Sequence, residues 1–133
     1  MNSKIEIRES VPIDDTELNS LISASWPNRS ISNWSPVLAR SLGYMCANSD
    51  DLLVGFVNIA WDGGVHAFIL DTTVHPEFRR RGIGRSLVEQ AKILSRQKGI
   101  EWLHVDYEPK SRDFYLECGF ESTEAGLIKL TPY

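Results

Sequence analysis

The stretch VHPEFRRRGIGRSLVEQA, residues 74–91, decides the fold of this 133-residue chain. Three consecutive arginines run into Gly82-Ile83-Gly84, and an amphipathic helix is predicted to begin there. The first amides of a helix lack an intrahelical partner and carry partial positive charge, so they attract phosphate. Glycine lets the backbone approach an anion closely. The stretch predicts an anion site, and a tight strand-to-helix turn with solvated arginines is the competing interpretation.

The elements on either side of this turn predict a βαβ unit. The segment HAFILDTTV, residues 66–74, is dense in apolar and β-branched residues, as expected of a central strand. The helix is predicted over residues 83–97, with Gly99 as its C-cap and one apolar face. That face consists of Ile83, Leu87, Val88, Ala91 and Leu94. A further strand is predicted over residues 101–107.

The rest of the chain predicts a sheet built mainly from hairpins. An Asp-Gly pair at residues 62–63 is a typical hairpin turn. The predicted order is β-α-α-β-β-β-α-β-α-β-β, a mixed α/β domain spanning residues 1–133. In such folds, ligands bind at the carboxyl ends of strands. The remaining predicted strands cover residues 4–10, 43–49, 52–61, 119–122 and 125–130, and the remaining helices cover 14–26, 36–42 and 109–118.

Composition narrows the classes of function. The net charge of −4 and the pI near 5.3 argue against general nucleic-acid binding, which needs a basic face. Apolar runs are too short for a membrane span, and the N-terminus MNSKIEIRESVP lacks the order of a signal peptide. Cys46 and Cys118 are too few for a disulfide scaffold and lack metal-ligand spacing. We expect one cytoplasmic domain with no metal and no membrane or nucleic-acid partner.

Two common phosphate motifs do not fit the glycine turn. A dinucleotide-binding GxGxxG motif requires glycine or alanine at position 87, where Leu87 stands. A P-loop requires glycine at position 79 and lysine at position 85, where Arg79 and Arg85 stand. The turn therefore belongs to neither nucleotide class.

The motif that does fit carries a resemblance to a known family. The run Arg79-Arg80-Arg81-Gly82-Ile83-Gly84 resembles the acetyl-CoA-binding motif of the GCN5-related N-acetyltransferases (GNAT): Arg or Gln, two residues, Gly, one residue, Gly or Ala. The approach Val74-His75-Pro76 and the segment FYLECGF, residues 114–120, are also similar to that family. The resemblance implies the GNAT fold and direct acetyl transfer from acetyl-CoA to a small-molecule or peptide amine in a ternary complex.

The resemblance also implies which residues bind the cofactor. Backbone amides around the glycine turn would bind the pyrophosphate of coenzyme A. Amides near the end of the 66–74 strand would stabilise the oxyanion that forms on the thioester during transfer. The family strand carries a bulge there, which opens a slot for the pantetheine arm. The implied cofactor-binding residues are Thr73, Val74, Arg79, Arg80, Arg81, Gly82, Ile83, Gly84, Arg85 and Ser86.

The same resemblance implies a catalytic acid. Tyr115 matches the family's tyrosine near the coenzyme sulfur, whose phenol can protonate the leaving thiolate; a core tyrosine is the competing interpretation. Asp71 is the first choice for the base, with His104, Asp106, Glu108 or a water chain as alternatives. Glu108 departs from the family, where asparagine is common at that place.

The acceptor side is less defined by the sequence. Trp26 and Trp34 in the 25–36 loop, together with Trp61, could form the wall of an amine pocket, and core or lid packing is the competing interpretation. A larger acyl group or an oxygen acceptor stays open, and a homodimer is an expectation from the family alone. The alternative function is a non-catalytic module of the same fold that binds acetyl-CoA.

Overall fold

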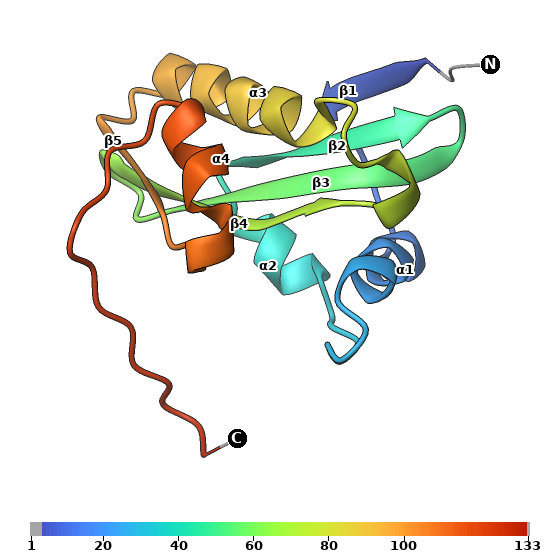
Figure 1. The fold of residues 1–133 in the computed structure, drawn as a ribbon, viewed down its shortest axis with the longest axis horizontal. Helices are drawn as coiled ribbons and strands as arrows, with labels where there is room; N and C mark the ends of the chain where they lie inside the picture. Colours follow the sequence, from blue (N-terminus) through green and yellow to red (C-terminus); the bar gives the residue numbers. More distant parts are fainter. Residues whose placement is uncertain (1–3, 133) are drawn as a thin grey trace.

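The computed structural model describes residues 4–132 and contains a five-stranded sheet between two layers of helices (Figure 1). The strands lie in chain order, β1-β2-β3-β4-β5. Neighbours are antiparallel except β4 and β5, which are parallel. The strands are β1 (Ile5–Glu9), β2 (Gly43–Ser49), β3 (Leu52–Trp61), β4 (His66–Val74) and β5 (Trp102–Val105).

The helices cover both faces of the sheet. Helices α3 (Ile83–Gln97) and α4 (Arg112–Glu117) lie on one face, and α1 (Asp15–Ser25) and α2 (Ser35–Ala39) lie on the other (Figure 1). A short 3-10 helix, Pro76–Phe78, leads into α3, and another, Pro109–Ser111, leads into α4. Helix α3 connects the parallel pair β4 and β5, which confirms the predicted βαβ unit.

Local chemistry explains where the two long helices form and how they pack. The Asp14 side chain caps α1 by accepting a hydrogen bond of 2.8 Å from the Glu17 amide. The predicted apolar face of α3 is buried against the sheet. Gly55 in β3 permits this close packing, because a Cβ there would lie 3.0 Å from Leu87 and 3.2 Å from Ile83.

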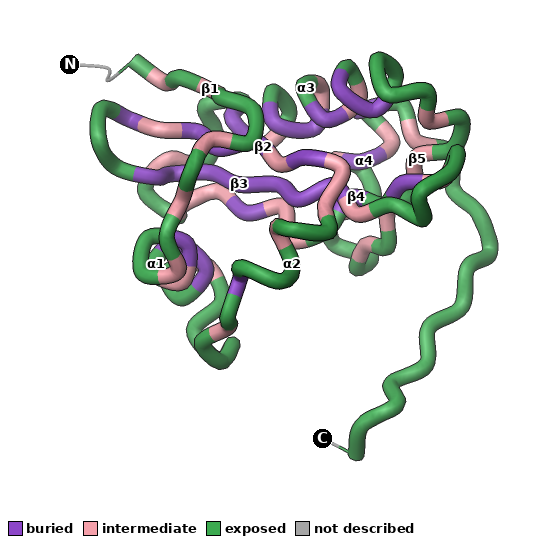
Figure 2. Tube along the Cα trace, turned by 180° about the vertical axis from the view of Figure 1, so that it is seen from behind, coloured by how far each residue is buried: buried purple, intermediate pink, exposed green. Residues whose placement is uncertain are grey.

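The last two predicted strands, residues 119–122 and 125–130, are wrong. The described part of the chain after α4 contains no strand, and it runs away from the sheet as an extended, exposed tail (Figures 1 and 2). A strand exists only where another strand supplies hydrogen-bonding partners, and no strand among residues 4–132 pairs with the tail. The strand predicted over residues 101–107 is also shorter and ends at Val105.

A bulge in β4 shapes the carboxyl end of the sheet. Phe56 pairs with Thr73, but Asn58 pairs with Leu70, so β4 carries one extra residue between these pairs. Asp71 adopts a left-handed φ of 58° at this point. The β4–β5 pairing ends just before the bulge, at Ile69 and Val105. The two parallel strands are therefore unpaired beyond it, and a slot lies between them.

Candidate functional site

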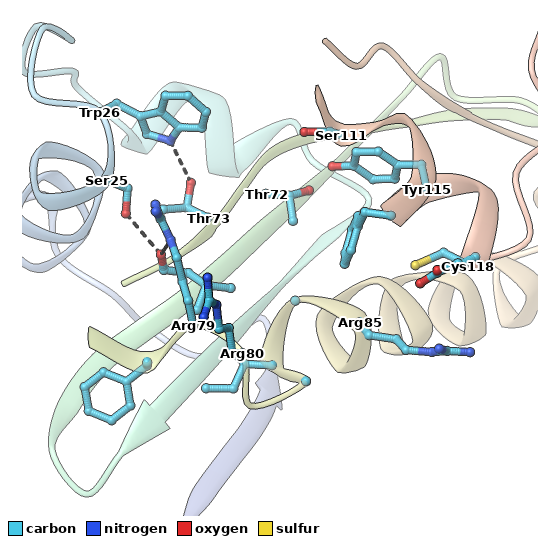
Figure 3. A pocket seen from close by; sticks show the side chains of 17 residues that line it. Ser25, Trp26, Thr72, Thr73, Arg79, Arg80, Arg85, Ser111, Tyr115 and Cys118 are labelled. Atoms are coloured by element: carbon cyan, nitrogen blue, oxygen red, sulfur yellow. Dashed lines mark hydrogen bonds between the residues drawn. The ribbon is translucent and has the colours of Figure 1, made fainter. Parts of the chain in front are cut away.

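A cleft of about 530 Å³ opens at the bulged end of β4. We call it the arginine cleft. It is bounded by the bulged end of β4, the start of α3 and one side of α4 (Figure 3). Its walls include Thr72, Thr73, Val74, Arg79, Arg80, Gly82, Gly84, Arg85 and Tyr115. The motif segments noted in the sequence, residues 74–84 and 114–120, are therefore neighbours in space.

The turn before α3 presents backbone amides to this cleft. Arg80 and Gly82 both have left-handed backbone conformations, with φ of 65° and 77°. Helix α3 begins after Gly82 without a side-chain cap, so its first amides are not occupied by a capping side chain. Turns of this kind with successive free amides form anion-binding concavities. The geometry favours the anion site over a merely structural turn.

The arginines of the motif do not share one role. Arg79 and Arg80 line the cleft, and the Arg79 Nε donates to the Val74 carbonyl over 3.4 Å. Arg85 lines the far side of the cleft beside α4 (Figure 3). Arg81 instead lies over the Phe78 ring, with its Cζ 5.0 Å from the ring centroid. Neither Arg81 nor the exposed Ser86 lines the arginine cleft. Ile83 does line it, although its side chain is largely buried in the core.

Thr73 and Val74 are held at the end of β4 by contacts from α1. The Ser25 hydroxyl donates to the Val74 carbonyl over 3.3 Å, and the Trp26 indole N–H donates to the Thr73 hydroxyl over 3.3 Å (Figure 3). Beyond Ile69, the backbone of β4 has no strand partner on its β5 side among residues 4–132. This leaves N–H and C=O groups at the slot that a ligand can bind.

Tyr115 is buried at the inner end of the arginine cleft, with 8% of its surface exposed. Its ring stacks on Tyr107 at a centroid distance of 5.5 Å and is edge-on to Phe114 and Phe120. Burial raises the pKa of the phenol above its ordinary value of 10.0, and the nearby Thr72 hydroxyl partly opposes that rise. The phenol therefore stays protonated at neutral pH and is available as a proton donor.

The Thr72 hydroxyl is a polar group that the sequence analysis missed. It is buried, and it has no hydrogen-bond partner among residues 4–132. A buried hydroxyl without a partner is uncommon and needs a reason. It lies on the Tyr115 side of the arginine cleft (Figure 3), beside the phenol.

A second cleft of about 550 Å³ lies on the other side of Tyr115. We call it the acidic cleft, because Asp71, Asp106 and Glu108 line it beside Arg29 and Lys110. The two clefts share Trp26, Thr72, Ser111 and Tyr115. They therefore meet at the phenol, and two ligands could approach each other there.

The acidic cleft contains most of the bases suggested by the sequence. Asp71 forms an ion pair with Arg29, with 2.8 Å between Oδ1 and Nη2, and its side chain is only 19% exposed. Glu108 pairs with Lys110 at 3.4 Å, and both side chains are mostly exposed. Positions 106 and 108 do not share a strand face with His104, since β5 ends at Val105.

His104 lies elsewhere, on the face of the sheet away from α3. Its Nε2 is 2.8 Å from the Nδ1 of His66, and its ring stacks on Phe68 at 4.4 Å between centroids. It lines neither cleft. The structure therefore offers no support for His104 as the base.

The three tryptophans expected at the acceptor side are separated in the structure. Trp26 lines both clefts, with the Lys110 Nζ 5.7 Å from its ring centroid. Trp34 is a core residue, 3% exposed, whose ring packs edge-on against Phe56. Trp61 pairs with Ala67 at the start of β4, the opposite end of the hairpin from the bulge. Of the two interpretations, core packing holds for Trp34, and neither Trp34 nor Trp61 lines a cleft.

The two cysteines are buried and free. Cys118 ends α4 and lines the arginine cleft. Burial raises the pKa of its thiol, and the carboxylate of Glu89 adds to the rise. Burial also raises the pKa of Cys46 to about 12. Both side chains are therefore thiols rather than thiolates at neutral pH, as a packing role requires.

Other contributors to the site had no distinctive sequence signal. Ser25, Arg29 and Ser111 come from loops or helix ends, and their roles depend on which residues the fold brings near them.

Within residues 4–132, no group of three or more His, Cys, Asp or Glu side chains could hold a metal ion. None of the described helices combines the length and hydrophobicity of a membrane span.

Comparisons with known proteins point to one family. The model of the acetyltransferase (GNAT) family matches residues 13–120. The N-acetyltransferase ycf52 of Pyropia yezoensis is 33% identical over 73 residues, which cover 55% of this chain and 42% of that protein. The chain thus spans less than half the length of the first curated relatives that it matches.

Solved structures agree with this assignment. The GNAT family acetyltransferase SP0256 from Streptococcus pneumoniae TIGR4 has a TM-score of 0.83 at 25% identity, covering 98% of this chain and 100% of that chain. The aminoglycoside N-acetyltransferase AAC(6')-Iy, solved in complex with CoA, has a TM-score of 0.75 at 20% identity. The match covers 100% of this chain and 98% of that chain. The second likeness concerns the fold alone.

Proposed function

Because the chain belongs to the acetyltransferase (GNAT) family, we propose that it transfers an acetyl group from acetyl-CoA to an amine. The observation that carries this proposal is the meeting of two clefts at Tyr115. One cleft is rich in arginine and backbone amides, which suit a polyphosphate. The other has three carboxylates against two cations, which suits a cationic amine.

The donor fits the arginine cleft by its chemistry. The uncapped start of α3 and the left-handed turn at Arg80 and Gly82 suit a pyrophosphate, with Arg79 and Arg85 as further donors. The pantetheine arm of coenzyme A carries amide groups. These could bind the backbone groups of β4 that lack a strand partner on the β5 side, and they could approach the Thr72 hydroxyl. The AAC(6')-Iy structure, which contains CoA, supports the same choice of donor by fold analogy.

The proposed reaction assigns a role to each side of the slot. The amine nitrogen attacks the thioester carbon, the C–S bond breaks, and the sulfur takes the phenolic proton of Tyr115. The proton released by the amine passes to Asp71 or through water from the acidic cleft, and solvent reprotonates the phenol. Backbone amides around Thr73 and Val74 stabilise the oxyanion. Both substrates bind together, so no acyl-enzyme forms.

Calorimetric titration with acetyl-CoA, CoA and dephospho-CoA tests the donor assignment. We expect binding of all three, because the pyrophosphate is common to them. Absence of binding at millimolar ligand would contradict the proposal. Thiol release in the presence of a panel of amines then tests for turnover. Tight binding without any turnover would favour the alternative, a non-catalytic acetyl-CoA-binding module.

Replacing the cleft cysteine provides a test of direct transfer. Cys118→Ser should leave kcat within about twofold of the wild-type value, because a buried thiol with a raised pKa is a poor nucleophile. The measurement is thiol release with acetyl-CoA and an accepted amine. Loss of activity, together with an acetylated Cys118 in the wild type by mass spectrometry, would instead indicate a covalent intermediate.

Asp71 can be tested as the base against a neighbouring carboxylate. We expect Asp71→Asn to lower kcat by about tenfold. This loss is small for the removal of a general base, because water in the open acidic cleft can still accept the proton. Glu108→Gln should change kcat little, because Glu108 is mostly exposed and pairs with Lys110. The measurement is thiol release at saturating acetyl-CoA and amine. Equally small changes in kcat in both variants would assign Asp71 a structural role with Arg29.

A further inference from the structure

Two histidines on the sheet face away from α3 have no part in the proposed reaction. His66 is the first residue of β4, and His104 lies in β5. The Nδ1 of His66 lies 2.8 Å from the Nε2 of His104, although the two residues are 38 positions apart in the sequence. Neither residue lines the arginine cleft or the acidic cleft. The pair is therefore a cluster of possible ligands separate from the proposed active site.

The register of the parallel strands brings the two rings together. His66 pairs with Trp102 and Phe68 pairs with His104, so the histidines are diagonal neighbours on one face of the sheet. The Phe68 ring stacks on the His104 ring, with 4.4 Å between centroids and 19° between planes, and this contact restricts the His104 ring. The Asp62 carboxylate accepts a hydrogen bond of 3.4 Å from the His66 amide, so a negative charge lies close to the pair.

The distance between the two ring nitrogens suits a shared metal ion. Bonds from imidazole nitrogen to such metals are about 2.0–2.1 Å long, so two bonds at a right angle place the nitrogens about 2.8–3.0 Å apart. Two bonds at a tetrahedral angle place them about 3.3–3.4 Å apart. The observed 2.8 Å therefore fits the square or tetragonal geometry of copper(II) and nickel(II) better than tetrahedral zinc. Rotation about the last side-chain torsion, which is broad for histidine, would turn both nitrogens toward one ion.

We propose that His66 and His104 form a surface site for one copper(II) or nickel(II) ion, with His66 Nδ1 and His104 Nε2 as its protein ligands. The ion replaces the hydrogen bond between the rings, and the proton of that bond moves through solvent to the other nitrogen of its own ring, so both ligand nitrogens are neutral and free. Within residues 4–132 no third His, Cys, Asp or Glu joins the pair, so water completes the coordination. The bound ion links β4 to β5 ahead of the slot.

Calorimetric titration of the untagged protein with nickel(II) and copper(II) tests the site. We expect one ion per chain, and His66→Ala and His104→Ala should each weaken binding by at least about tenfold, because each removes one of two protein ligands. The matched control is His75→Ala, since His75 is the third histidine of the chain and accepts a hydrogen bond from the Glu77 amide in the turn after β4. It should bind as the wild type does. No binding by the wild type, or equal binding by all three variants, would overturn the proposal.

Two further measurements separate an ion held by both histidines from an ion held by one. The electron paramagnetic resonance spectrum of the copper(II) form should be tetragonal with coupling to two imidazole nitrogens, and each single variant should lose one of them. Metal at about 100 times its dissociation constant should raise Tm by about 10 °C in the wild type and in His75→Ala, but not in His66→Ala. Coupling to one nitrogen in the wild type, or one ion per two chains, would overturn the proposal. No readout depends on acetyl-CoA, so the test is independent of the proposed function.

Discussion

Gly82→Glu should weaken the binding of CoA by about 10³-fold, the equivalent of several kcal/mol of like-charge repulsion in a site built for an anion. Gly82 has a φ of 77° at the mouth of α3, and its carboxylate replacement would point into the open space of the arginine cleft. The measurement is the dissociation constant of CoA by calorimetry. Wild-type affinity in the variant would contradict the assignment of this turn to the pyrophosphate.

Two other variants separate charge from backbone strain. Gly63→Glu is the matched control, because Gly63 has a φ of 83° and also has open space around it, but lies in the β3–β4 hairpin away from the cleft. It should bind CoA as the wild type does. Gly82→Asn places an uncharged residue that tolerates the left-handed conformation at the turn. It should lose far less affinity than Gly82→Glu.

Tyr115→Phe should lower kcat by about 10²- to 10³-fold, the range expected for loss of a general acid. The dissociation constant of CoA should change little, because the ring and its stacking on Tyr107 are retained. The matched control is Tyr107→Phe, which removes a phenol from the other ring of the same stack. That variant should keep most of its activity. Equal and small losses in both variants would exclude Tyr115 as the acid.

The pH dependence gives a second signature of Tyr115. Burial raises the pKa of the phenol above 10.0, so the protonated form that donates to sulfur persists through neutral and mildly alkaline pH. In the wild type, kcat should fall only when the pH rises above about 10, the ordinary tyrosine pKa. This alkaline decrease should be absent from the residual activity of Tyr115→Phe.

The sequence was most informative where local physics determines the structure. The apolar face of α3 and the alternation in β1 predicted those elements close to their observed bounds, and the glycine turn predicted the start of α3. The turn lies beside Tyr115 as expected, because both follow strands whose carboxyl ends share one edge of the sheet.

The parts that were missed depend on contacts between distant residues. Trp34 is a core residue because Phe56, in β3, lies against it, and no property of the 25–36 loop indicates that contact. The ion pair between Arg29 and Asp71 likewise joins a loop to a strand bulge. The tail has the composition of a strand, but a strand requires a pairing partner, and no strand among residues 4–132 pairs with it.

The bulge at Asp71 has a consequence for how long the protein persists in a cell. It interrupts the sheet, and beyond Ile69 the end of β4 has no strand partner on its β5 side among residues 4–132. A ligand that fills this gap stabilises the folded state, by about 2.7 kcal/mol when it is present at 100 times its dissociation constant. Shifts of this size change the steady-state abundance of a protein several-fold. The abundance of the protein should therefore depend on how much of that ligand is present.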